Sequence, residues 1–390
     1  MTTLPRGSAP SLRPAQPLLL AWAVGLLLRA LRVGAETHAE SKTEFYAEEN
    51  KRVKVLSESL LFELAPAAPL TLRGSVVHDA ISGATPDGGP ARAGDRHIRL
   101  VSLDDARTAG AFEAALRLGR HTIRPKIAYS TESDYTSVTP SLNYVLDLNR
   151  RNTSLNLGVS HNFDSAIRGR YLVHSQSRDS TDFLAGLTQV LTPHTLWNAT
   201  LTLGTASGYL SDPYKGFLFT DYGDLNSLFP ERRPGHRTKQ IVSTTLAEFI
   251  EPLDASVETT YRFYHDSFGL VGHTVTVEWL QNIGRRVVVA PLLRYYAQSA
   301  ADFYQLSSQG DPSDVNQPNN VFIPQFYSSD YRLSHLSTLT YGVTVMARVW
   351  KRLWMDAAFK RYEMRGLDRR TAQDNYPKAN IFTAGIRYRF

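Results

Sequence analysis

The last ten residues of the chain decide the fold, and they read Ile381-Phe382-Thr383-Ala384-Gly385-Ile386-Arg387-Tyr388-Arg389-Phe390. Side chains in a β-strand alternate between two faces. One face then carries Phe382, Ala384, Ile386, Tyr388 and Phe390, and the other carries Thr383, Gly385, Arg387 and Arg389. A soluble core would have to bury a free carboxylate together with the final phenylalanine. The pattern instead favours a membrane barrel, in which apolar side chains face lipid and arginines face a wet lumen.

The composition agrees with such a barrel. The chain has 390 residues, is 42% hydrophobic and has a mean hydropathy of −0.27, which is the bulk value expected when half of each strand is polar. Aromatic residues make up 11%, with 19 Tyr and 17 Phe, enough to supply belts at the membrane interfaces. The absence of cysteine is compatible with passage through an oxidising periplasm.

The N-terminus has the pattern of a secretory signal peptide over residues 1–35. Arg6 and Arg13 precede an apolar run over residues 17–28, and Val33-Gly34-Ala35 forms a small-residue cleavage site. Four of the 43 Lys and Arg residues lie in this segment, which leaves 39 basic against 37 acidic residues after cleavage. This near balance predicts no nucleic-acid partner. Residues 36–390 are expected to form a single barrel domain.

Alternation of apolar and polar side chains recurs along the mature chain. It predicts sixteen strands, at 42–47, 52–64, 70–79, 112–118, 123–129, 142–148, 155–160, 183–191, 196–203, 241–250, 255–266, 274–281, 287–296, 339–349, 353–362 and 381–390. Short turns near 66, 120, 150, 193, 252, 284 and 351 alternate with mostly longer connections, among them 81–105, 208–236 and 300–332. The predicted fold is therefore an all-β, antiparallel transmembrane barrel with short periplasmic turns and longer outer loops.

The terminal Phe390 after an alternating strand is similar to the C-terminal signature of bacterial outer-membrane barrels. Several internal stretches also resemble one bacterial outer-membrane barrel family that is catalogued only as a domain of unknown function. These stretches are 79–86, 208–215, 261–266, 294–304 and 329–333. The resemblance implies a barrel in the outer membrane of a Gram-negative bacterium, surrounded by lipid and lipopolysaccharide and recognised by the barrel-assembly machinery at Phe390. It supplies no activity.

The sequence offers no convincing catalytic or metal site. A Gly-rich phosphate loop, HExxH and GxSxG are all missing from it. His265, Asp266 and His273 are the nearest approach to a hydrolase, but consecutive residues of a strand point to opposite faces. The scattered histidines have no ligand spacing. We therefore expect no enzyme, no cofactor and no metal, and keep a membrane hydrolase only as a third hypothesis.

Candidate ligand or constriction residues come from two loops and from the lumen face. In the loop after residue 208, Asp212, Tyr214 and Lys215 either grip a ligand or form an ordinary turn. Arg294 and Tyr295 either fold inward or belong to a strand top with an aromatic belt. Arg262 and Arg387 carry charge on the predicted lumen face.

Charges of both signs on the lumen face suit two arrangements. One is a hydrated channel with a transverse field, and the other is a bore filled by ion-paired side chains. The first hypothesis for function is a passive channel or porin for small solutes. The second is a non-conducting surface barrel that binds a partner or has a structural role in the envelope.

Overall fold

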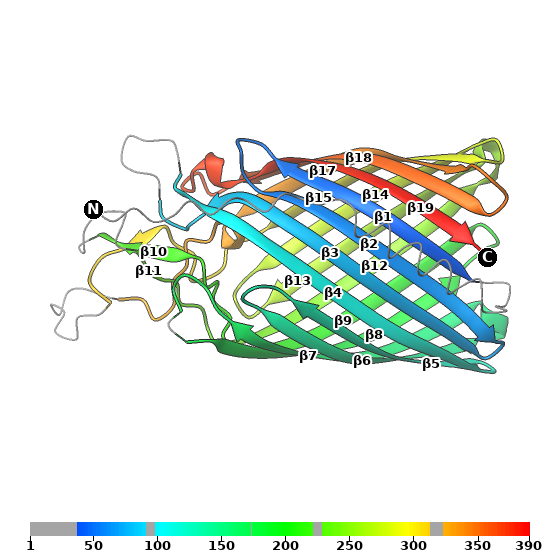
Figure 1. The fold of residues 1–390 in the computed structure, drawn as a ribbon, viewed down its shortest axis with the longest axis horizontal. Coiled ribbons are helices and arrows are strands. Elements are labelled where there is room, and N and C mark those ends of the chain that lie inside the picture. Colours follow the sequence, from blue (N-terminus) through cyan, green and yellow to red (C-terminus); the bar gives the residue numbers. More distant parts are fainter. Residues whose placement is uncertain (1–36, 91–97, 173, 221–227, 313–322) are drawn as a thin grey trace, which may run out of the picture.

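The structure is a computed structural model that describes residues 37–90, 98–172, 174–220, 228–312 and 323–390. Its main element is a closed antiparallel barrel of sixteen strands, inclined to the long axis of the molecule (Figure 1). In chain order these are β1 (His38–Glu48), β2 (Lys54–Ala67), β3 (Leu70–Pro86), β4 (Leu100–Leu118), β5 (His121–Thr131), β6 (Thr136–Leu148), β7 (Thr153–Ile167), β8 (Gln176–Val190), β9 (Thr195–Gly208), β12 (His236–Ile250), β13 (Ala255–Asp266), β14 (Val271–Ile283), β15 (Val287–Gln298), β17 (Leu336–Arg348), β18 (Leu353–Gly366) and β19 (Lys378–Arg389). The predicted fold class and strand number are confirmed. The predicted signal peptide lies outside the described residues.

The terminal strands close the barrel. β1 pairs with β19 from His38 opposite Arg389 to Glu48 opposite Ala379, so the sheet has no free edge. The backbone N–H of Phe390 extends this pairing by donating to the carbonyl of Thr37 at 2.9 Å. A closed ladder satisfies every strand's backbone groups internally, which is what a hydrocarbon environment requires.

The two faces of the wall have the predicted alternation. Large apolar side chains cover the outer face and remain exposed, and on β19 Phe382 and Ile386 are 51% and 47% exposed. Polar and charged side chains line the lumen. Among the described residues, no α-helix has the length and apolar character that a membrane-crossing helix needs.

The seven predicted short turns lie at one end, together with the C-terminus (Figure 1), whereas the short connections after β1, β5 and β13 lie at the opposite end. We call the opposite end the loop end. The prediction for residues 81–105 was wrong in part, because β3 continues to Pro86 and β4 begins at Leu100, paired with it. Backbone pairing continues beyond the apolar part of these strands, where no lipid selects apolar side chains, so composition alone suggested a loop.

Three short strands at the loop end were not predicted. β10 (Gly216–Phe219) pairs with β11 (Leu228–Pro230) in antiparallel and with β16 (Ser307–Ser308) in parallel. Two of them come from the connection after β9 and the third from the connection after β15, and β10 and β11 lie beyond the barrel wall in Figure 1. A further helical turn, η4 (Tyr331–Leu333), lies in the connection between β15 and β17.

Candidate functional site

The connections at the loop end pack into one folded layer. We call residues 87–90, 209–220, 228–235, 267–270, 299–312 and 323–335 the loop layer. Phe217, Phe219 and Tyr327 form an aromatic core in it, with ring centroids 4.7 to 5.2 Å apart. A second core joins Phe268 and Leu270 to Leu333. These loops therefore carry a hydrophobic interior of their own, separate from the lipid-facing surface.

A buried carboxylate ties the loop layer together. Asp330, which is 1% exposed, precedes η4 and accepts hydrogen bonds from the backbone N–H of Arg332 at 3.1 Å and from its Nε at 2.9 Å. Nη2 of Arg233 donates to Asp330 at 2.9 Å, and Arg233 also pairs with Glu231 at 2.7 Å. Burial by itself would raise the pKa of Asp330, but the guanidinium groups of Arg332 and Arg233 hold it below its usual range.

The structure engages Asp212, Tyr214 and Lys215 within the protein. Asp212 accepts a hydrogen bond from the backbone N–H of Tyr214 at 2.9 Å, as in a turn, and also pairs with Arg332. The hydroxyl of Tyr214 donates to Asp134. Lys215 is buried and donates to the carbonyl of Pro86, and burial lowers the pKa of its ammonium group. The motif thus forms a turn whose three side chains fasten three parts of the loop end.

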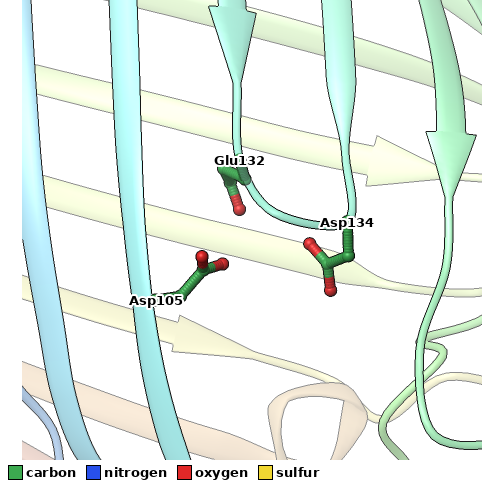
Figure 2. A group of neighbouring side chains, drawn as sticks. All are labelled: Asp105, Glu132 and Asp134. Carbon is green, nitrogen blue, oxygen red and sulfur yellow. The ribbon is translucent and has the colours of Figure 1, made fainter.

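Three carboxylates lie beside this turn. Asp105 lies on β4, and Glu132 and Asp134 lie in the connection between β5 and β6. The three carboxylates place oxygen atoms within 4.8 Å of one another (Figure 2). Burial, followed by the charge of Asp105, raises the pKa of Glu132. All three side chains are only partly buried, and Asp134 already accepts from Tyr214. Acidic groups at a wet rim are common without an ion, so this cluster by itself defines no metal site.

Two cavities meet at η4. The outer one, of about 350 Å³, is lined by the turn that contains Asp212 and Tyr214 and by the connection that contains Asp134. The inner one, of about 710 Å³, lies in the lumen; we call it the lumen cavity. Arg332 and Leu333 line both, so these two side chains stand between the loop end and the lumen.

The lumen cavity is walled by strands from β13 to β19. Arg262, Arg294 and Lys360 line it from β13, β15 and β18, and Tyr264, Tyr296 and Tyr362 lie among them. Apolar lining comes from Leu270, Leu292, Leu333, Leu336, Met364 and Ile381. Two of the predicted candidates, Arg262 and Arg294, are therefore brought together here.

Two other candidates lie elsewhere. Tyr295 stands opposite Val275 and Leu339 on the outer face and is 50% exposed, so it faces away from the lumen that Arg294 enters. Arg387 lies near the short-turn end of β19 and pairs with Glu40 at 2.6 Å. Tyr295 and Arg387 do not line the lumen cavity.

The inner wall elsewhere carries many ion pairs. They include Arg73 with Glu113 at 3.2 Å, Arg117 with Asp147 at 3.2 Å, Lys239 with Asp182 at 2.9 Å and Lys42 with Asp356 at 3.6 Å. Within the part of the chain that the structure describes, Arg262, Arg294 and Lys360 have no ion pair. Paired and unpaired charges thus occupy different sectors of one lumen.

The residues considered for hydrolysis do not assemble. Nδ1 of His265 lies 3.3 Å from Gln240, and Nδ1 of His273 lies 2.8 Å from the hydroxyl of Tyr261. Asp266 is buried and accepts from Nε of Arg237 at 2.8 Å on the lumen side. The carboxylate and the two imidazoles therefore serve different neighbours.

Sequence reasoning missed Glu231, Arg233, Asp330 and Arg332 as a group. Asp330 and Arg332 belong to one of the stretches that resemble the family, but nothing local indicates that this loop returns over the barrel mouth. The ion pair of Arg233 with Asp330 joins residues 97 positions apart. Contacts of this kind depend on loop packing, which leaves no periodic signal in the sequence.

A closed antiparallel sheet with an apolar outside and a polar inside defines the chain as a β-barrel of the outer-membrane class. The chain belongs to the family described as proteins of unknown function (DUF3570), whose model matches residues 25–175 and 166–382. This family assignment agrees with the resemblance found in the sequence. No curated protein matches the chain.

Solved structures support the fold class. CdiB from Acinetobacter baumannii is similar with a TM-score of 0.51 at 9% identity, covering 90% of this chain and 60% of CdiB. The chain therefore spans less than two thirds of that protein. A bacterial polysaccharide outer-membrane secretin has a TM-score of 0.48 at 8% identity, covering 92% and 99%, and a loop-deletion variant of OmpT from Vibrio cholerae has 0.45 at 9%, covering 91% and 98%. The similarity to CdiB shows the fold alone, because the identity is 9%.

Proposed function

We propose that this protein lies in the outer membrane of a Gram-negative bacterium and acts as a passive channel for small solutes. The observation that carries the proposal is the lumen cavity of about 710 Å³, lined by charged and tyrosine side chains inside a closed sheet. Sixteen strands usually leave room for water, and a polar wall permits its entry. The loop layer narrows the outer mouth.

The same proposal covers export and membrane partners. Residues 1–35 act as the signal peptide, and the assembly machinery recognises Phe390 at the end of the closing strand. The outer face contacts lipid and lipopolysaccharide. The proposal assigns no catalytic step, no metal, no cofactor and no nucleic acid to the chain.

Conductance in planar lipid bilayers tests the channel. Purified, folded protein should give stepwise current increments of uniform size upon insertion. Increments should grow when the loop layer is loosened by Asp330→Asn, because Arg332 stands between the mouth and the lumen. Many insertions of folded protein with no current would contradict the proposal.

The second candidate function is partner binding at the cell surface without conduction. The loop layer favours it, because an aromatic core and a buried ion-pair network are more structure than an open pore requires. Silence in bilayers, together with an unchanged fold, would support this role over a channel.

A further inference from the structure

The lumen cavity concentrates positive charge in one sector of the wall. Register places Arg262 opposite Thr274, Thr276 opposite Arg294, and Gly342 opposite Lys360. The three cations stand on alternate barrel strands, β13, β15 and β18, so neighbouring members are about 10 Å apart in strand spacing.

No carboxylate of the described chain lines this cavity. Two other cations, Arg237 and Arg332, also line the cavity. Both are paired with a carboxylate, since Arg237 binds Asp266 and Arg332 binds Asp330. Arg262, Arg294 and Lys360 make no such pair, although Glu–Arg and Asp–Lys pairs are frequent on the rest of the inner wall. Unpaired like charges in a confined lumen raise the local potential and concentrate anions.

Two glutamates, Glu258 on β13 and Glu278 on β14, stand opposite each other. They lie two residues nearer the short turns than Thr260 and Thr276. Neither forms an ion pair with a described cation, and neither lines the cavity. The positive sector therefore has a negative border, which limits the anion to the cavity itself.

The rest of the lining indicates what the anion carries. Leu292, Met364 and Ile381 supply apolar surface beside the rings of Tyr296 and Tyr362. The hydroxyl of Tyr296 donates to Oε1 of Gln298 at 2.6 Å, so its proton is already used within the protein. Cationic groups next to apolar and aromatic walls are complementary to a charged head on an apolar body.

We propose that the lumen cavity is a binding site for a small organic anion: a carboxylate, drawn to Arg262, Arg294 and Lys360, carried on an apolar or aromatic body that packs against Leu292, Met364 and the tyrosines. This inference deepens the proposed channel function, because it names the solute class that the channel selects. It does not need conduction in order to be true.

Benzoate is the probe, and benzamide is its neutral counterpart of similar shape. Titration calorimetry on the full-length mature protein in detergent measures binding directly. Benzoate should bind saturably and benzamide should not. Arg262→Gln combined with Arg294→Gln should weaken benzoate binding at least about tenfold, since each charge-assisted hydrogen bond contributes more than a neutral one.

The matched control is Arg117→Gln, which also removes a lumen arginine, but one paired with Asp147. It should leave benzoate affinity unchanged. Should the double variant fail to fold, as judged by heat-modifiable gel mobility, Lys360→Gln alone provides the same test. Equal binding of benzoate and benzamide, or equal losses in the Arg117 control and the cavity variants, would overturn the site.

Bilayer recordings separate this inference from the channel proposal. If the protein conducts, benzoate should reduce chloride current in wild type and lose that effect in the cavity variants. Saturable benzoate binding without any conductance would refute the channel proposal and support the binding site. Conductance without benzoate binding would refute the binding site and support the channel proposal.

Discussion

At the scale of the residue, one buried carboxylate holds the mouth of the barrel. Asp330 accepts from both Arg233 and Arg332, and each of these arginines has one further carboxylate partner, Glu231 or Asp212. Removing Asp330 takes away the carboxylate that the two guanidinium groups share, and with it the hydrogen bonds that connect them. Asp330 is therefore the position at which a single substitution should have the largest effect on the loops.

The substitution Asp330→Asn should destabilise the loop layer by about 1.5–3 kcal/mol while leaving the barrel wall folded. Hydrogen exchange measured by mass spectrometry should show faster exchange in residues 323–335 and unchanged protection in β1 to β9. The control is Glu251→Gln, whose side chain is 78% exposed in a turn at the other end and should change stability by less than about 0.5 kcal/mol.

The same side chain gives this prediction a pH arm. Because the folded pKa of Asp330 is depressed, its stabilisation is complete above the usual aspartate pKa of about 3.9 and is lost as pH falls below that value. Protection factors in the wild-type loop layer, which compare each exchange rate with the intrinsic rate at the same pH, should therefore fall below about pH 4. Asp330→Asn should lack this acid step, and a step of equal size in the variant would refute the assignment to Asp330.

At the scale of the element, the connection after β3 packs closely against β10 at Gly88. Gly88 has a φ of +94°, and a Cβ there would lie 2.5 Å from the carbonyl oxygen of Gly216. The hydroxyl of Ser329 donates to the carbonyl oxygen of Gly88. Three connections thus meet where any side chain on residue 88 would separate them.

We predict that Gly88→Ala opens the loop layer without weakening the barrel. Gly119→Ala is a matched control, because Gly119 also has a positive φ, +63°, but has no atom within 4 Å of an added Cβ. It should carry only the backbone cost of about 1–2 kcal/mol. Limited proteolysis is the measurement: cleavage in the loop layer should increase for Gly88→Ala alone, and equal cleavage in both variants would contradict the close approach.

At the scale of the whole molecule, the outer face of the barrel exposes many large apolar side chains. Leu157, Phe183 and Leu118 are each more than half exposed. In water such an apolar belt would cause aggregation. In a bilayer it faces hydrocarbon, where apolar side chains are favourable. The stability of the closed sheet is therefore tied to its lipid surroundings.

A charge on this belt should be costly in a bilayer. Leu157, which is 57% exposed on β7, is replaced by arginine, and we expect a loss of about 2–4 kcal/mol if the position lies near the midplane. Ser160→Arg, on the lumen face of the same strand, is the control and should cost much less. Denaturant titration of folding into lipid vesicles measures both, and similar losses would mean that the outer face does not meet hydrocarbon.

The part of this fold that sequence predicts is the part governed by period two. The run from Phe382 to Phe390 and its counterparts could be assigned because lipid and water select opposite side chains at every step of a strand. Strand number and the end that carries the short turns follow from the same alternation. Strand ends near Pro86 and Leu100 were missed, because outside the membrane nothing selects for composition.

Alternation also placed Arg262, Arg294 and Arg387 on the lumen face, but it could not tell their roles apart. Arg387 has Glu40 beside it only because β19 closes on β1, and Arg294 has no carboxylate because Thr276 and Thr340 stand beside it in the register. Which charges are paired is a property of neighbouring strands. It is set by pairing between distant parts of the chain.

The amino-acid sequence by itself determined the barrel, its outer and inner faces and its sixteen strands, because each residue alone reports the solvent it meets. Only the tertiary structure decided that the outer connections fold over the mouth and that one sector of the lumen keeps its cations unpaired. Both depend on side chains far apart in the chain, such as Arg233 and Asp330, and a local pattern carries no information about such contacts.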